Sequence, residues 1–147
     1  TQGAEFGALT KKTPKSLLKI NKKSLLDYQI NILNKSGVKD ISIVSGFKHT
    51  LYKFHNTKIY INKNWKKTSN LQSLWVAKDE LKDTIISFGD IIYSEKALQI
   101  LKNVNKEKED IVILCDKSWL NHTYFRKHYI GIKCNFIYII YNGKFYK

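Results

Sequence analysis

The chain has 147 residues, of which 43% are hydrophobic, and this size suits one globular domain with a core of its own. No apolar run approaches the roughly 20 residues of a bilayer-spanning helix, and nothing at the start resembles a signal peptide, so we expect a cytoplasmic protein with no membrane partner. The formal net charge is +14, but every basic residue except Arg126 is a lysine, and the lysines are spread along the whole chain. Because nucleic-acid surfaces cluster basic residues and favour arginine, the charge indicates anionic partners in general and hardly favours DNA or RNA over a nucleotide.

The first predicted helix covers residues 24–36, after a basic segment that ends at Pro14-Lys15. Ser24 can cap this helix, its leucines and isoleucines fall on one face, and Gly37 stands where a left-handed residue commonly ends a helix. Strands are predicted next over residues 38–45 and 58–62.

A second helix is expected after Thr68 or Ser69, either of which can serve as its cap. Its buried stripe would comprise Leu71, Leu74, Trp75 and Leu81. The remaining predicted elements are a strand over 84–88, a helix over 95–103, and strands over 110–115 and 133–141. Two cysteines, Cys115 and Cys134, lie in or beside apolar runs without the close spacing of a metal site, which favours reduced structural thiols. Strands that alternate with helices predict a single α/β domain with a mostly parallel sheet.

Ligands of open parallel sheets collect beyond the carboxyl ends of the strands, and two charged candidates should lie there. Asp90 follows a predicted strand, and a carboxylate there could hold Mg²⁺ together with phosphate oxygens, while Gly89 would let the ligand approach the backbone closely. Lys15 follows Pro14, whose fixed φ stiffens the chain, and a lysine held there could neutralise phosphate charge. The plainer explanations are a capping aspartate in a turn and one more solvent lysine, like Lys11 and Lys12.

A third candidate segment is Thr68-Ser69-Asn70, at the start of the second predicted helix. Its backbone N–H groups and hydroxyls could bind a base edge or a phosphate. The alternative is an ordinary helix cap.

Four blocks of sequence carry a resemblance to a known family. They are LTKKTPKSLLKINKKSLLDYQINILNKSGVKDISIVSGFK (9–48), NKNWKKTSNLQSLWVAKDEL (62–81), DTIISFGDIIYS (83–94) and DIVILCDKSW (110–119). In this order they resemble the nucleotidyltransferase family that makes nucleotide sugars, most closely its phosphocholine and 2-aminoethylphosphonate cytidylyltransferase branch. The resemblance implies a three-layer α/β/α sandwich with a mostly parallel, Rossmann-like sheet, whose first strand and C-terminal part would be missing from this chain.

By position, the resemblance implies that Lys15 contacts phosphates in the transition state and that Asp90 binds Mg²⁺. It also implies nucleotide-binding roles for a wider set: Gly3 and Ala4 in the loop that wraps the triphosphate, Thr68, Ser69 and Asn70 near the base, and Gly89. The sequence departs from the family pattern where Thr1 replaces a glycine and Glu5 replaces an arginine. A carboxylate near a triphosphate is repulsive unless a metal ion or a lysine intervenes.

The activity implied by the resemblance is transfer of CMP from CTP to a phosphate or phosphonate of a small amine, with Mg²⁺ as cofactor and release of pyrophosphate. Asp116 and Trp119 are candidates for holding a cationic head group; the plainer explanation, which the residue type favours, is that Trp119 is a packed core residue. The alternatives are a hexose-1-phosphate nucleotidyltransferase using UTP or dTTP, a basic nucleic-acid-binding module, and a non-catalytic nucleotide-binding regulatory domain. Nothing in the sequence determines the base, the acceptor or the oligomeric state.

Overall fold

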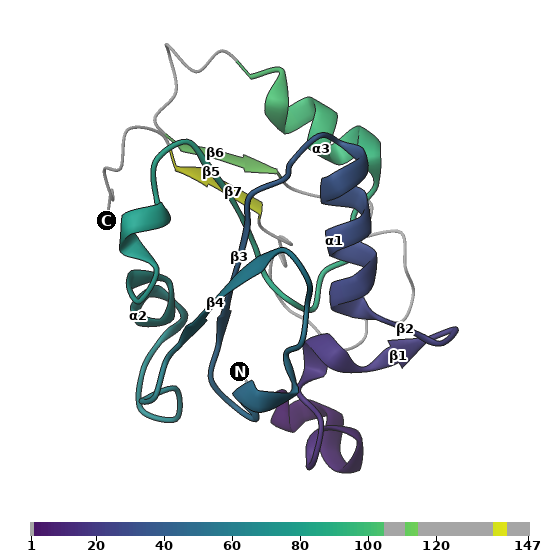
Figure 1. Ribbon diagram of the computed structural model, residues 1–147, viewed down its shortest axis with the longest axis vertical. Coiled ribbons are helices and arrows are strands. Elements are labelled where there is room, and N and C mark those ends of the chain that lie inside the picture. The colour runs from purple at the N-terminus through teal and green to yellow at the C-terminus, as the bar shows by residue number, and fades with distance from the viewer. Residues whose placement is uncertain (1, 105–110, 115–136, 141–147) are drawn as a thin grey trace, which may run out of the picture.

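The computed structural model describes residues 2–104, 111–114 and 137–140 (Figure 1). Its helices are η1 (Ala4–Thr10), η2 (Lys15–Leu17), α1 (Leu25–Lys35), η3 (His49–Leu51), α2 (Asn70–Trp75), η4 (Lys78–Glu80) and α3 (Glu95–Lys102). Its strands are β1 (Lys19–Ile20), β2 (Lys23–Ser24), β3 (Ile41–Ser45), β4 (Thr57–Ile61), β5 (Thr84–Ser87), β6 (Ile111–Leu114) and β7 (Ile137–Ile140). The alternation of helices and strands confirms the predicted α/β class.

The described strands pair in both directions. β3 and β4 are parallel, with Ile43 opposite Ile59, as expected for strands joined by a crossover. β7 lies between β5 and β6 and is antiparallel to both, and β1 with β2 forms a short antiparallel hairpin. In the part of the chain that the structure describes, no helix is long and apolar enough to cross a membrane.

Helix α1 forms where the sequence predicts it because both of its ends are capped. The side chain of Ser24 accepts a hydrogen bond from the backbone of Asp27, whose carboxylate accepts one from the backbone of Ser24 in return. At the other end Gly37 adopts a φ of 83°, and the N–H of Val38 donates to the carbonyl of Leu33 over 2.9 Å. This turn uses residues that the sequence assigned to the next strand, so β3 begins later than predicted.

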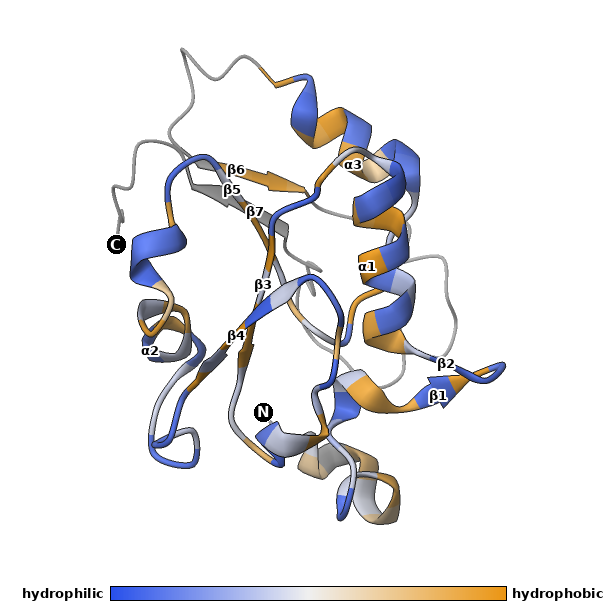
Figure 2. Ribbon diagram, in the orientation of Figure 1, coloured by the Kyte–Doolittle hydropathy of each residue, from blue (hydrophilic) through white to orange (hydrophobic). Residues whose placement is uncertain are grey.

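The main hydrophobic cluster joins α1, α3 and the three-stranded sheet. Leu98 and Leu101 of α3 are almost fully buried, and Tyr93 beside them is buried as well. Residues packed against this cluster come from α1 (Ile32, Leu33), from β5 and the segment that follows it (Ile85, Ile91) and from β6 (Val112, Leu114). Figure 2 shows the apolar stripes of α1 and α3 close to each other. Since burying each large aliphatic side chain contributes about 1.5–3 kcal/mol, this cluster fixes the connection between β5 and α3 against α1.

The predicted buried stripe of the second helix is wrong at two positions. Leu71 and Trp75 are 59% and 56% exposed, whereas Leu81 is buried and Leu74 is partly buried. The helix is also shorter than predicted, because α2 ends at Trp75 and the buried Leu81 follows η4. The helical period does not say whether another element covers the face of Leu71 and Trp75. Instead, the ammonium of Lys78 lies 5.6 Å from the centre of the Trp75 ring, a cation–π contact at the surface.

Candidate active site

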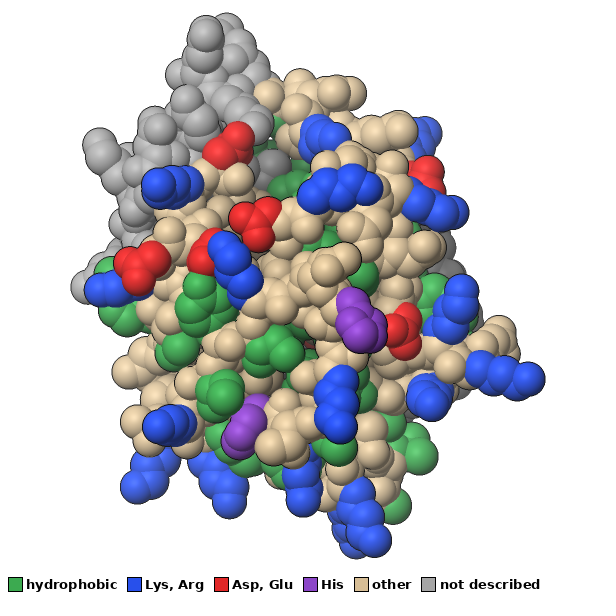
Figure 3. All heavy atoms as spheres, viewed as in Figure 1, with side chains coloured by type: hydrophobic (Ala, Val, Ile, Leu, Met, Phe, Trp, Pro, Cys, Tyr) green, Lys and Arg blue, Asp and Glu red, His purple; other side chains and the backbone are tan. Residues whose placement is uncertain are grey.

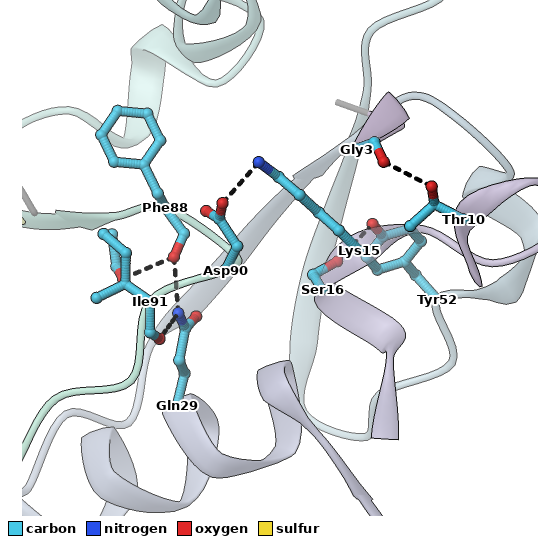
Figure 4. A network of polar contacts seen from close by, with 10 residues as sticks. Gly3, Thr10, Lys15, Ser16, Gln29, Tyr52, Phe88, Asp90 and Ile91 are labelled. Atoms are coloured by element: carbon cyan, nitrogen blue, oxygen red, sulfur yellow. Dashed lines mark hydrogen bonds and ion pairs between the residues drawn. The ribbon is translucent and has the colours of Figure 1, made fainter. Parts of the chain in front are cut away.

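An ion pair joins the two charged candidates, which are far apart in the chain. The Nζ atom of Lys15, on η2, lies 2.6 Å from the Oδ2 atom of Asp90, in the loop that follows β5 (Figure 4). Their side chains are 19% and 30% exposed, so the pair is shielded from solvent and still reachable by a ligand. Partial shielding strengthens the attraction of both groups for opposite charge compared with free solution.

The position of Lys15 depends on its buried neighbours. Pro14 is fully buried, and its carbonyl accepts a hydrogen bond from the N–H of Leu17 that starts η2. Ser16 is also buried, and its hydroxyl lies 2.9 Å from the hydroxyl of Tyr52. Burial raises the pKa of Tyr52, so the phenol stays neutral and keeps this hydrogen bond at physiological pH. Lys15 is therefore held from both sides along the chain.

The N-terminal loop packs on the aliphatic stem of Lys15. Gly3 adopts a φ of 81°, and a Cβ atom at that position would lie 2.8 Å from the Cβ of Lys15. The hydroxyl of the fully buried Thr10 donates to the carbonyl of Gly3 over 2.5 Å, which closes the loop (Figure 4). Ala4, the neighbouring candidate, is exposed at the start of η1. Gly3 thus lies beside Lys15, whereas the Ala4 side chain is free for contact with solvent or a ligand.

Replacing Gly3 tests this close approach. An alanine in the left-handed conformation costs about 1–2 kcal/mol. Gly3→Ala should lower the free energy of unfolding by more than this, because the new Cβ also displaces the stem of Lys15. The matched control is Gly37→Ala. Gly37 has a similar φ of 83°, and the nearest atom to a Cβ there would be the Nζ of Lys102 at 3.9 Å, an ordinary contact distance. Thermal unfolding of the two variants gives the comparison. Equal losses would show that Lys15 moves aside without cost.

The loop that carries Asp90 is held by helix α1 and by η2. A Cβ on Gly89 would lie 3.0 Å from the Cβ of Ser16, so the glycine allows the two segments to touch. From α1, the buried side-chain amide of Gln29 donates to the carbonyls of Phe88 over 2.7 Å and of Ile91 over 2.5 Å. The sequence marks Gln29 only by its position one helical turn after Leu26, on the apolar face of α1.

The predicted base-binding segment, Thr68-Ser69-Asn70, is held by hydrogen bonds from the residues around it. The amide of the buried Asn62 donates to the hydroxyls of Thr68 and Ser73 over 2.8 and 2.9 Å. The hydroxyl of Ser69 caps α2, as the plainer explanation held, and Asn70 is exposed at the first position of that helix. Asn62 was another residue that the sequence analysis did not identify. The described contacts show how this segment is shaped, and a role in binding a base remains a prediction.

The described carboxylates offer one possible metal ligand at this site. Across residues 2–104, 111–114 and 137–140, no three His, Cys, Asp or Glu side chains are grouped so as to hold a metal ion. Asp90 alone fits a magnesium ion that takes most of its oxygens from phosphates and water, because Mg²⁺ commonly binds one or two carboxylates in this way. The predicted head-group residues Asp116 and Trp119, together with Thr1, Cys115 and Cys134, lie outside the described residues.

Lysines are scattered over the face of the molecule shown in Figure 3, both across it and along its edge, and acidic side chains lie among them in the upper and middle parts. The carboxyl ends of β3 and β4 and the helix η1 share the lower end of the molecule in Figure 1. On this face the positive charge is distributed, as the spacing of lysines along the sequence predicts.

Comparison with known proteins confirms the family that the sequence blocks indicate. The family model described as "MobA-like NTP transferase domain" matches residues 3–132. The chain is 33% identical over 129 residues to the CTP:phosphoglutamine cytidylyltransferase of Campylobacter jejuni, covering 80% of this chain and 50% of that protein. It is 28% identical to the choline-phosphate cytidylyltransferase of Streptococcus pneumoniae (60% and 40% covered) and 28% identical to the 2-aminoethylphosphonate cytidylyltransferase of Lancefieldella rimae (64% and 41% covered).

Solved structures show the same fold. The CTP:phosphocholine cytidylyltransferase of Streptococcus pneumoniae superposes with a TM-score of 0.56 at 19% identity, covering 92% of this chain and 62% of that one. A Bacillus anthracis protein assigned as a glucose-1-phosphate thymidylyltransferase superposes with a TM-score of 0.64 at 18% identity, covering 97% and 68%. The chain spans about half the length of the curated relatives it matches.

Proposed function

The chain belongs to the MobA-like NTP transferase domain family, and from this premise we propose that the protein transfers CMP from CTP to a phosphate or phosphonate oxygen of a small amine-bearing acceptor. The observation that carries the proposal is the contact between Lys15 and Asp90, which brings a cation and a carboxylate together from distant segments. The relatives named for phosphoglutamine, choline phosphate and 2-aminoethylphosphonate support cytidine and this class of acceptor.

The chemistry needs positioning more than proton transfer. An anionic oxygen of the acceptor forms a bond to the α-phosphorus of CTP as the bond to the bridging oxygen of the β-phosphate breaks, and pyrophosphate leaves with that oxygen. Because the nucleophile is already an anion, no general base is required. The ammonium of Lys15 would neutralise charge on the phosphates, and its stem is fixed for this purpose by Gly3 and Ser16.

Asp90 would hold Mg²⁺ in the same site. The ion would supply charge neutralisation and align the triphosphate oxygens for displacement. Contacts with Ser16 and Gln29 hold the backbone of the loop from which the Asp90 carboxylate projects. Asp116 and Trp119 remain our candidates for the acceptor's cationic group.

Pyrophosphate release tests the proposal. The full-length protein with CTP and Mg²⁺ is supplied with phosphocholine, 2-aminoethylphosphonate or a phosphorylated glutamine, and in parallel with hexose 1-phosphates and UTP or dTTP. We expect release with CTP and one of the amine-bearing acceptors, and none once the metal is chelated. Release with a hexose 1-phosphate instead would favour nucleotide-sugar synthesis. No release with any of the four nucleotides would contradict the proposal, and oligonucleotide binding that weakens steeply with salt would then favour a nucleic-acid module.

A further inference from the structure

A glutamine inside helix α1 bridges that helix to the loop of Asp90. Gln29 is 4% exposed, and its Nε2 atom donates two hydrogen bonds to backbone carbonyls almost 60 residues away, which roughly saturates the donors of one amide. Figure 4 shows this amide between the carbonyls of Phe88 and Ile91, on the same loop as the carboxylate that meets Lys15. Both N–H donors of this buried amide are used. A glutamate of the same side-chain length could not replace it, because an ionised carboxylate has no donor.

The turn also makes hydrogen bonds within itself, one of them from the hydroxyl of Ser87 to the carbonyl of Phe88 over 3.2 Å. The backbone N–H of Ile91 donates to the carbonyl of Phe88 over 3.4 Å, which is long for a hydrogen bond. The bonds from Gln29 measure 2.7 and 2.5 Å and reach the carbonyls on both sides of Gly89-Asp90. The amide of Gln29 therefore ties this turn to α1 on both sides of Asp90, in addition to the bonds that the turn makes within itself.

We propose that Gln29 is a positioning residue, which holds the turn so that the Asp90 carboxylate can receive the divalent cation while it faces Lys15. This inference rests on the proposed nucleotidyl transfer and adds to it a residue that touches neither nucleotide nor metal. Groups that orient a metal-binding side chain typically change metal affinity about 10- to 100-fold when they are replaced.

The first test compares two variants on the same helix. Gln29→Met keeps the length of the side chain and removes both donors. Ser24→Ala removes the cap of α1, which destabilises the helix, but Ser24 makes no described hydrogen bond to the Asp90 loop. Binding of Mn²⁺, a substitute for Mg²⁺, is measured by electron paramagnetic resonance in the presence of CTP. The Mn²⁺ dissociation constant should rise about 10-fold or more in Gln29→Met and stay close to wild type in Ser24→Ala.

The second variant covers the case in which Gln29→Met does not fold. In Gln29→Glu an ionised carboxylate faces two carbonyl oxygens, and protonation restores one donor. The ratio of its Mn²⁺ dissociation constant to that of wild type should therefore fall towards one as the pH is lowered. A ratio that is still close to one at the alkaline end of the series, where the carboxylate is ionised, would overturn the positioning role.

The two proposals fail in different ways. If the wild type binds Mn²⁺ and releases pyrophosphate, and Gln29→Met matches Ser24→Ala in both measurements, Gln29 has a structural role and the proposed function stands. If Gln29→Met weakens Mn²⁺ binding and no variant or wild type releases pyrophosphate with any acceptor, the positioning role stands and the transferase proposal fails.

Discussion

Asp90→Asn is expected to reduce pyrophosphate release by about 100- to 1,000-fold, because the neutral amide is a poor ligand for Mg²⁺ and the electrostatic support of the phosphates is lost. The fold should persist. A partly exposed ion pair with Lys15 contributes at most about 1 kcal/mol to stability, since solvent screens both partners. Initial rates over a series of Mg²⁺ concentrations, together with thermal unfolding, measure the two effects separately.

The matched control for this variant is Asp40→Asn. Asp40 also pairs with a lysine, Lys58, over 3.7 Å, but its side chain is 77% exposed and belongs to the segment before β3. Its replacement should leave the turnover unchanged. Should Asp90→Asn retain wild-type turnover at every Mg²⁺ concentration, Asp90 takes no part in the reaction.

The parts of the fold that could be predicted from the sequence are those whose signals are local. Ser24 and Gly37 mark the two ends of α1 because capping depends on the backbone of the next few residues. Lys15 and Asp90 could be expected near each other from the rule that ligands of open parallel sheets bind beyond the carboxyl ends of the strands, and the family resemblance added their roles. The structure then shows their direct contact, and their roles in binding phosphate and metal await the experiments.

The features that the sequence left undetermined depend on tertiary contacts. Gln29 lies on the apolar face of α1, but the sequence does not show what its amide binds, because the carbonyls belong to a loop much later in the chain. Leu71 and Trp75 have the spacing of a buried stripe, and their exposure depends on what lies next to α2. The apolar run that forms β7 indicates a strand and says nothing about its direction, and the structure shows it to be antiparallel to β5 and β6.

Lys15→Met is expected to lower the rate constant of nucleotidyl transfer by about 100- to 1,000-fold, with a smaller effect on the apparent affinity for CTP, because the charge of Lys15 matters most as charge builds up on the phosphates. The methionine keeps much of the aliphatic stem that packs on Gly3, so the N-terminal loop should remain closed. Lys11→Met and Lys12→Met are the controls: both lysines are exposed in the same segment, and both variants should behave as wild type.

Combining Lys15→Met with Asp90→Asn tests whether the pair acts as a unit. Groups that depend on each other give strongly non-additive losses, so the double variant should be little worse than the poorer single variant. If the two residues contribute independently, the fold losses of the single variants should multiply in the double variant. Lys15 and Asp90 would then be in contact without acting together on the phosphates. The additivity measurement therefore distinguishes a joint site for phosphate charge from two charged residues that happen to meet, which is the point on which the proposed transfer depends.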